Sequence, residues 1–207
     1  MARDAAVFVI DDDPGVRRSL TALGQAHGLT VETYASMHAF LAAYDPKRPG
    51  CLLLDVRLGS RNGLDLQDAL RRRRASLPII VMTGHGDVAT SVRAFRAGAF
   101  DFMEKPVPPC KLIRRLREAL AMDQKRRQAE SEQKDAKERF SRLTAREREV
   151  ARHLLDGRTS KEIARSLGIS PRTVEGHRHR VLEKMAARSV VQLAGPLGPL
   201  LRGARTT

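Results

Sequence analysis

The first 120 residues repeat one pattern five times, in which a short apolar run is followed by a segment with helical spacing of apolar residues. Short apolar runs are typical of strands that are buried on both faces. Strands that alternate with helices form parallel sheets covered by helices on both sides. The pattern therefore predicts a doubly wound, five-stranded parallel α/β sheet.

We expect strands at residues 6–10, 29–34, 51–54, 77–82 and 99–103. We expect the intervening helices at residues 14–27, 36–43, 64–73, 87–97 and 109–121. Ser36 is a suitable N-cap for the second helix. Cys51 opens an apolar run, which indicates a small core residue.

The chain changes character after residue 121. From Asp123 to Arg142 it is charged and, apart from Phe140, nearly free of large apolar residues. Such a segment is either a continuation of the preceding helix or a solvated linker, and we favour a protruding helix that frays. We therefore expect three regions, at residues 1–121, 122–141 and 142–207.

Three helical patterns occupy residues 144–186. Thr144 and Glu147 form a capping-box signature, and Thr159 or Ser160 caps a second, short helix. Gly168 then turns the chain, and Ser170-Pro171 is an N-cap followed by proline at the first helical position. A short helix, a glycine turn and a further helix predict a small all-α helix-turn-helix domain.

The formal net charge is +14, and the 87 residues from 121 onward carry +9 of it. A polyanion is the natural partner of such a segment, either nucleic acid or an anionic membrane surface. No apolar run approaches the roughly 20 residues of a membrane span, and the N-terminus lacks a secretory signal. We therefore expect a cytoplasmic protein without a membrane partner. Cys51 and Cys110 match neither a disulfide framework nor a zinc site.

Chemically active side chains follow four of the predicted strands. At or directly after the ends of these strands come Asp11-Asp12-Asp13, Asp55, Thr83 and Lys105. Such strand ends converge in a doubly wound sheet. Carboxylates gathered in one cleft need a cation, and oxygen ligands with room for water suit Mg²⁺. An aspartate beside Mg²⁺ can attack a phosphoryl group, and lysine and threonine can hold its oxygens.

Residues 5–120 resemble the receiver domain of two-component response regulators, which has a flavodoxin-like fold. Four motifs carry the resemblance, in order and at receiver spacing: residues 7–13, 53–57, 82–87 and 102–106. The Thr-Gly-His-Gly-Asp segment at 83–87 is most similar to the FixJ branch.

The resemblance implies that Asp55 is the phosphoacceptor. Asp11 and Asp12 would hold Mg²⁺ together with Asp55 and the backbone carbonyl of Arg57. Asp13 is instead expected to be an exposed neighbour.

The resemblance also assigns the switch. Thr83 and Lys105 would act at the phosphoryl group, Phe102 would be the switch aromatic, and the Lys105–Pro106 peptide would be cis. The sequence departs from many receivers at Leu58-Gly59, where proline is absent and a more flexible loop is expected, and at Val107, which replaces an aromatic residue.

Residues 143–188 resemble the LuxR/FixJ/NarL-type helix-turn-helix domain, on the motifs at residues 143–150, 157–164, 167–175 and 181–185. The resemblance implies base contacts near Glu175, Gly176 and His179. We expect phosphate contacts from Lys161, Arg172, Thr173, Arg178 and Arg180. His177 is expected to pack inside, and residues 195–199 shorten the fourth helix that often mediates dimerisation in this family.

The sequence thus predicts a two-component response regulator. A sensor histidine kinase would phosphorylate Asp55, and a phosphorylated homodimer would bind double-stranded promoter DNA, with RNA polymerase as a further partner and activation favoured over repression. The receiver would catalyse only its own phosphorylation and dephosphorylation. Two alternatives stay open: a DNA-binding regulator independent of phosphorylation, and an aspartate-nucleophile phosphohydrolase that uses Asp11-x-Asp13.

Overall fold

The computed structural model describes residues 5–58, 61–63, 66, 69–70, 76–84 and 88–195. The chain divides into two compact units, with the division between Arg127 and Gln128. Each unit buries its own clusters of apolar side chains.

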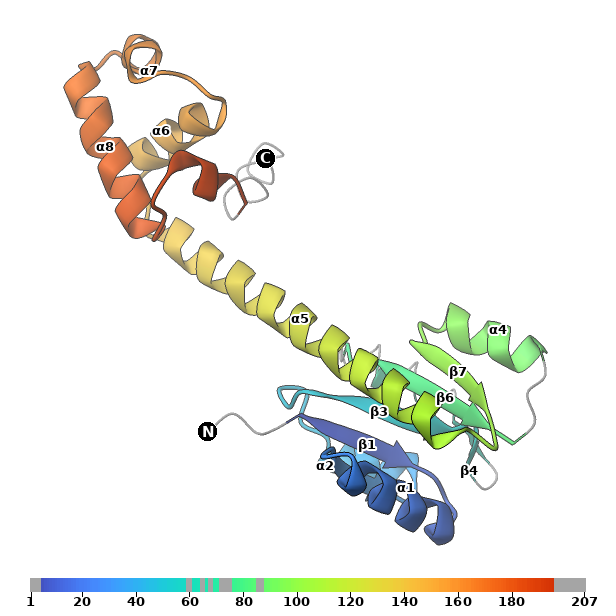
Figure 1. Cartoon of the computed structure of the whole chain (residues 1–207). Helices are drawn as coiled ribbons and strands as arrows, with labels where there is room; N and C mark the ends of the chain where they lie inside the picture. Colours follow the sequence, from blue (N-terminus) through green and yellow to red (C-terminus); the bar gives the residue numbers. More distant parts are fainter. Residues whose placement is uncertain are drawn as a thin grey trace. The chain divides into compact units, whose positions relative to one another are not determined.

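A five-stranded parallel sheet with the order β2-β1-β3-β6-β7 forms the centre of the N-terminal unit (Figure 1). Its strands are β1 (Ala6–Ile10), β2 (Thr30–Tyr34), β3 (Gly50–Asp55), β6 (Ile79–Thr83) and β7 (Asp101–Glu104). Every residue of β1, β3 and β6 is buried, which explains why their sequences are continuous apolar runs. The predicted doubly wound α/β fold is confirmed.

Helices pack on both faces of this sheet. They are α1 (Pro14–Ala26), α2 (Met37–Ala43), α4 (Val88–Arg96) and α5 (Pro109–Ser141). On one face, Phe8 and Leu52 belong to a cluster that includes Phe40 of α2. On the other face, Leu53 belongs to a cluster that includes Leu116 of α5 and side chains of α1.

Several predicted boundaries differ from the structure. β7 begins at Asp101 rather than at residue 99, because Gly98, at φ 89°, ends the preceding turn and the Ala99 N–H bonds back to Ala94. A small antiparallel hairpin, β4 (Arg57–Leu58) and β5 (Arg61–Asn62), follows β3 and was not predicted. The helix expected at residues 64–73 lies largely outside the described residues.

α5 continues without a break to Ser141 and so crosses the division between the two units. The charged segment at 122–141 is therefore helical, which is the alternative we favoured. Among the described residues, no helix combines the length and the apolar character needed to cross a membrane.

The C-terminal unit contains α6 (Ala145–Leu155), α7 (Ser160–Leu167) and α8 (Pro171–Lys184), and residues 190–195 are also helical. Thr144 forms the predicted capping box, and Ser170 caps α8 before Pro171, as predicted. Of the two candidates for the cap of α7, Thr159 takes the position, in a capping box with Glu162. Gly168 ends α7 in the left-handed conformation at φ 65°. These caps define the tight connection between α7 and α8 that a helix-turn-helix requires.

Candidate functional site

The carboxyl ends of four strands bring the predicted acidic site together. Asp11 follows β1, Asp55 ends β3, Thr83 ends β6 and Lys105 follows β7. The parallel registers align these ends along one edge of the sheet. Doubly wound sheets bind their ligands at this edge.

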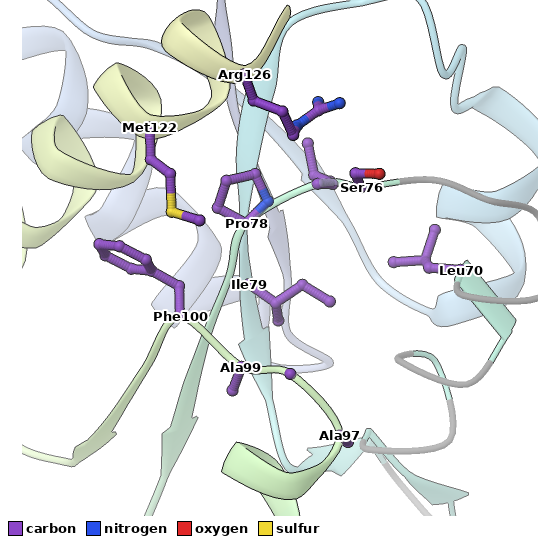
Figure 2. A pocket seen from close by; sticks show the side chains of 11 residues that line it. Leu70, Ser76, Pro78, Ile79, Ala97, Ala99, Phe100, Met122 and Arg126 are labelled. Carbon is purple, nitrogen blue, oxygen red and sulfur yellow. The ribbon is translucent and has the colours of Figure 1, made fainter. Parts of the chain in front are cut away.

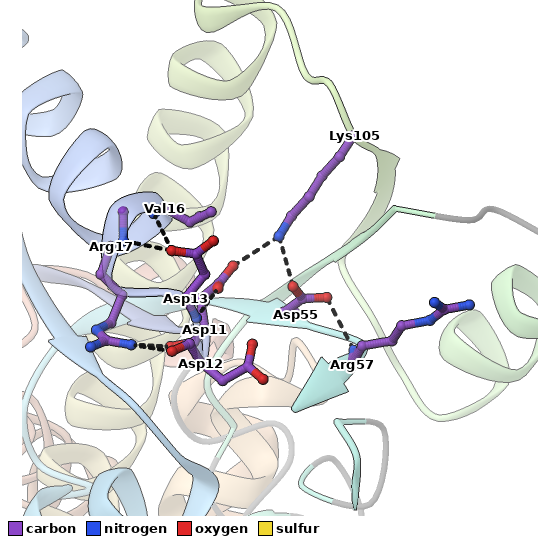
Figure 3. Close-up of polar contacts among 9 residues, drawn as sticks. Asp11, Asp12, Asp13, Val16, Arg17, Asp55, Arg57 and Lys105 are labelled. Atoms are coloured by element: carbon purple, nitrogen blue, oxygen red, sulfur yellow. Dashed lines mark hydrogen bonds and ion pairs between the residues drawn. The ribbon is translucent and has the colours of Figure 1, made fainter. Parts of the chain in front are cut away.

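Lys105 joins two of the carboxylates (Figure 3). Its Nζ donates to Asp11 Oδ2 at 2.8 Å and to Asp55 Oδ2 at 2.7 Å. Asp11 is only 1% exposed and Asp55 only 8%. One ammonium group therefore offsets part of the repulsion between two buried carboxylates.

The environment of this site shifts two pKa values. Burial raises the pKa of the Asp11 carboxyl, and hydrogen bonds from Lys105 and Asp13 only partly offset the effect. Burial acts to lower the pKa of Lys105, but its contacts with Asp11 and Asp55 outweigh burial, so the pKa is raised. Lys105 therefore stays positively charged at neutral pH.

Arg17 of α1 holds the loop that carries the three consecutive aspartates. Its Nη1 donates to the carbonyl oxygens of Asp11 at 2.7 Å and Asp12 at 2.9 Å. Asp13 is exposed, as predicted, and its carboxylate caps α1 by accepting from two N–H groups of the first turn. Sequence reasoning missed Arg17, because the spacing of a helix gives no sign of a side chain turned back onto a loop.

The chain beyond Asp55 folds back tightly. The Arg57 N–H donates to Asp55 Oδ1 at 3.1 Å, and the Gly63 N–H donates to Val56 O at 2.7 Å. A Cβ at Gly63 would lie 2.1 Å from Asp55 O, so the close approach requires glycine. The role of Gly63 was missed, although a glycine eight residues after a candidate acceptor was a signal that a turn returns there.

The two predicted switch residues lie on neighbouring strands. Thr83 is 1% exposed, and its carbonyl accepts the Lys105 N–H at 2.7 Å. Phe102 of β7 pairs in register with Val81 and packs half-buried against the core. The Lys105–Pro106 peptide is cis, as expected. Residues 85–87 of the motif lie outside the described residues.

The acidic edge has the donor chemistry that Mg²⁺ prefers. Asp11 and Asp55 direct carboxylate oxygens to one point, which the Lys105 ammonium shares, and the exposed Asp12 follows Asp11 directly. Hard oxygen donors beside solvent suit Mg²⁺. In the described part of the chain, three or more acidic, histidine or cysteine side chains are nowhere gathered as a ready metal site. The carboxylates of Asp11, Asp12 and Asp55 fit the ion by their chemistry, although they are not assembled as a three-ligand cluster.

The C-terminal unit exposes most of the side chains expected to meet DNA. Val174 and Val181 are the buried residues of α8, and His177 is half-buried, as expected. Lys161 is exposed on α7, and the exposed predicted residues of α8 are Arg172, Thr173, Glu175, Gly176, His179 and Arg180, with Arg178 half-buried. Apart from Lys161, these residues lie on α8, the helix that follows the tight turn at Gly168.

Two of these positions have features that the sequence did not reveal. The Glu175 carboxylate accepts from the Ser160 hydroxyl and lies 3.7 Å from Arg178 Nη1, so α7 and α8 share it. A Cβ at Gly176 would meet only the tip of Arg180, at 3.7 Å. Packing within the unit therefore does not require glycine there.

Comparison with known proteins identifies both units. Residues 7–117 match the family described as response regulator receiver domain, and residues 141–195 match the bacterial regulatory proteins of the luxR family. The chain belongs to the response regulators. This response regulator is 42% identical over 193 residues to the transcriptional regulatory protein FixJ of Azorhizobium caulinodans, covering 93% of this chain and 92% of that protein. It is 40% identical over 189 residues to nodulation protein W of Bradyrhizobium diazoefficiens, covering 91% and 83%.

Solved structures agree with this assignment. The response regulator StyR matches with a TM-score of 0.83 and 37% identity over 94% of this chain and 98% of that one. Full-length FixJ from B. japonicum matches with a TM-score of 0.59 and 35% identity over the same shares. The response regulator is therefore a FixJ-like transcriptional regulator with a receiver and a LuxR-type DNA-binding domain. A receiver implies a partner histidine kinase, and a LuxR-type domain implies DNA as a ligand.

Proposed function

We propose that Asp55 accepts a phosphoryl group from a sensor histidine kinase and that this modification controls the binding of α8 to promoter DNA. The observation that carries the proposal is the contact of Lys105 Nζ with Asp55 Oδ2, at 2.7 Å, at the carboxyl end of β3. Asp55 is the one acidic side chain of β3, and this contact puts its buried carboxylate next to a cation.

The chemistry follows from this arrangement. A carboxylate oxygen of Asp55 attacks the phosphorus of phosphohistidine, the P–N bond breaks, and an acyl phosphate forms. Lys105 stays beside the product and pairs with its new oxygens, and the Thr83 hydroxyl approaches from the adjacent strand end. Mg²⁺, held by Asp11, Asp12, Asp55 and the Arg57 carbonyl, would supply charge neutralisation at the phosphoryl group.

Phosphorylation then shifts a population of conformations. Thr83 moves toward the phosphoryl group, and Phe102 on the neighbouring strand changes its packing. The phosphorylated form pairs as a homodimer, so that two α8 helices meet two half-sites. We assign residues 1–121 to the receiver, 122–141 to a charged helical linker and 142–207 to the DNA-binding domain.

On DNA, Glu175, Gly176 and His179 meet base edges. A glutamate can accept from the amino group of cytosine, and close approach of a backbone suits glycine. Contacts to phosphates come from Lys161, Arg172, Thr173, Arg178 and Arg180. The protein acts in the cytoplasm as an activator that works with RNA polymerase, and its only catalysis is its own phosphorylation and dephosphorylation.

Labelling with a small-molecule phosphodonor tests the proposal. We expect Asp55→Asn to abolish incorporation and the matched control Asp13→Asn, an exposed acid of the same cleft, to retain it. Footprinting of the target promoter with and without phosphodonor should show protection that depends on Asp55. Incorporation that survives in Asp55→Asn would contradict the proposal.

The same assays separate the two alternatives. Steady multiple-turnover hydrolysis lost in Asp11→Asn but kept in Asp55→Asn identifies a phosphohydrolase. DNA affinity that beryllofluoride leaves unchanged identifies a regulator that is independent of phosphorylation.

A further inference from the structure

A buried polar cluster fastens α5 to the loop before β3. Asp123 of α5 is 0% exposed, and its Oδ2 accepts from the Gly50 N–H at 3.0 Å and from Arg127 Nε at 2.7 Å. Its other carboxylate oxygen pairs with Arg126. We call this cluster, Asp123, Arg126 and Arg127 with residues 46–50, the α5 latch.

Arg127 binds the loop through its forked guanidinium. Nη2 donates to Pro46 O at 3.0 Å and Arg48 O at 2.8 Å, and Nη1 donates to Lys47 O at 3.0 Å. One side chain thus satisfies three successive carbonyl groups and a buried carboxylate. Lysine cannot do this, because it presents a point charge rather than a rigid fork.

Apolar packing does not hold this part of α5. The buried apolar side chains of the helix on the sheet end at Ala119. Met122 is 51% exposed, and it lines with Arg126 a pocket of about 530 Å³ beside Pro78 and Phe100 (Figure 2). The polar contacts of the α5 latch therefore keep the helix on the N-terminal unit at this level. The segment lies beyond residue 117, where the receiver match ends.

The α5 latch and the acidic site contact opposite ends of one strand. β3 begins at Gly50, whose N–H donates to Asp123, and ends at Asp55, whose carboxylate accepts from Lys105. Both holding residues belong to one continuous stretch of chain, residues 105–127. β3 itself is fully buried between β1 and β6, and closely packed interiors transmit displacement rather than absorb it.

We propose that Asp123 and Arg127 are positioning residues for signalling. They fix the middle of α5 against the loop before β3, so that a change at Asp55 and Lys105 reorients the helix and does not let it slide along the sheet. The proposal rests on the proposed function, because it needs a phosphorylation signal to transmit. The α5 latch does not touch Asp55 itself, so it acts on the readout and leaves the phosphorylation chemistry in place.

The test measures, in the full chain, the ratio of promoter affinities with and without beryllofluoride. We expect Arg127→Ala, Arg127→Lys and Asp123→Asn to lower this ratio by about fivefold or more, while phosphodonor labelling of Asp55 continues. The matched control is Lys125→Ala, which removes one exposed positive charge from the same turn. Faster hydrogen exchange of the amides at 120–127 in the latch variants should accompany the loss.

The outcomes separate the two proposals. If the wild type has an affinity ratio above one and the variants of the α5 latch keep that full ratio, the signalling role of the α5 latch is wrong. A wild-type ratio of one overturns the proposed function, and the signalling role of the latch falls with it. A merely structural role would weaken labelling and both affinities together without changing their ratio, which also overturns the proposal. If Arg127→Ala does not fold, Arg127→Lys and Asp123→Asn decide the matter.

Discussion

Lys105 and Asp55 form an ion pair, 2.7 Å long, in which the lysine is shared with a second carboxylate, that of Asp11. The lysine ammonium therefore occupies the position to which a divalent cation would also be attracted. Lysine and a metal ion would compete for the carboxylates of Asp11 and Asp55.

This competition predicts a magnesium-dependent effect of Lys105→Gln. Without Mg²⁺, we expect the variant to lose about 2 kcal/mol of unfolding free energy, because two buried carboxylates lose their charged donor. Millimolar Mg²⁺ should stabilise the variant more than the wild type, since binding to the folded state adds to stability by mass action. Urea unfolding with and without Mg²⁺ measures both effects. Equal stabilisation of the two proteins would show that Lys105 and the ion do not compete.

Two helical glycines should respond to alanine in opposite directions. A Cβ at Gly24 of α1 would lie 2.2 Å from Val31 Cγ2, whereas a Cβ at Gly176 meets only ordinary contact at 3.7 Å. Gly24→Ala should therefore destabilise the N-terminal unit, by about 2 kcal/mol. Gly176→Ala should stabilise α8 by about 1 kcal/mol, and it should weaken DNA binding if the backbone approaches the bases. Thermal unfolding and a promoter-binding assay on both variants give the comparison, and stabilisation without loss of affinity would remove Gly176 from the DNA contacts.

Glu147 should make the C-terminal unit sensitive to acid. Burial acts to raise the pKa of Glu147, but hydrogen bonds from Lys184, at 2.7 Å, and from Thr144 outweigh burial, so the pKa is lowered. The stability that the charged form contributes is present above the ordinary pKa of 4.5 and is lost as pH falls through the lowered value. We expect Glu147→Gln to unfold more easily than wild type at neutral pH, and the difference to shrink below about pH 4. Glu183→Gln, at an exposed position, serves as the control, and a pH-independent difference would contradict the assignment.

The two cysteines should differ in reactivity. Cys110 is exposed in the first turn of α5, whereas burial, reinforced by the charge of Asp123, raises the pKa of Cys51 to about 12. Because the thiolate is the reactive form, iodoacetamide at mildly alkaline pH should modify Cys110 alone. Mass spectrometry of peptides checks this, and Cys51 should react only when urea opens the sheet. Early modification of Cys51 in the native protein would be inconsistent with its burial on β3.

Specific and general DNA contacts should be separable. Glu175→Ala should relax discrimination at one base pair of the site by about tenfold, because a base-edge contact is lost. Lys161→Ala should weaken binding to all sequences alike and reduce the dependence of affinity on salt. Titrations of a panel of single-base variants at several salt concentrations distinguish the two. The Ser160 hydroxyl donates to the Glu175 carboxylate, so Ser160→Ala tests whether that contact aligns the carboxylate for DNA. Unchanged discrimination between base pairs in this variant would show that it does not.

The sequence predicted what depends on residue type and local spacing. Continuous apolar runs predicted the buried strands, and Asp55 and Lys105 were found because doubly wound sheets collect reactive groups at strand ends. Ser170 and Thr144 were predicted as caps because capping depends on residues only three positions apart. The receiver and helix-turn-helix resemblances rest on motifs of this kind.

What the sequence did not reveal depends on contacts between distant segments. Arg17 turns back onto the aspartate loop, Gly63 packs against the carbonyl of Asp55, and Asp123 reaches Gly50 across 73 positions. Asp123 looked like any other charge in a solvated segment, since burial is a property of the folded chain. Helical periodicity alone gives no sign that the side chain of Asp123 returns to Gly50.

The forked contact of Arg127 has a practical consequence for engineers who exchange sensory and DNA-binding modules between proteins of this kind. A junction cut at residue 121 would separate the carboxylate and guanidinium from the loop at 46–50, and would leave the Gly50 N–H buried without its acceptor. A junction placed after Arg127 would carry the whole cluster with the receiver. Chimeras joined after Arg127 should therefore keep an intact receiver, whereas chimeras joined at residue 121 should contain a less stable receiver.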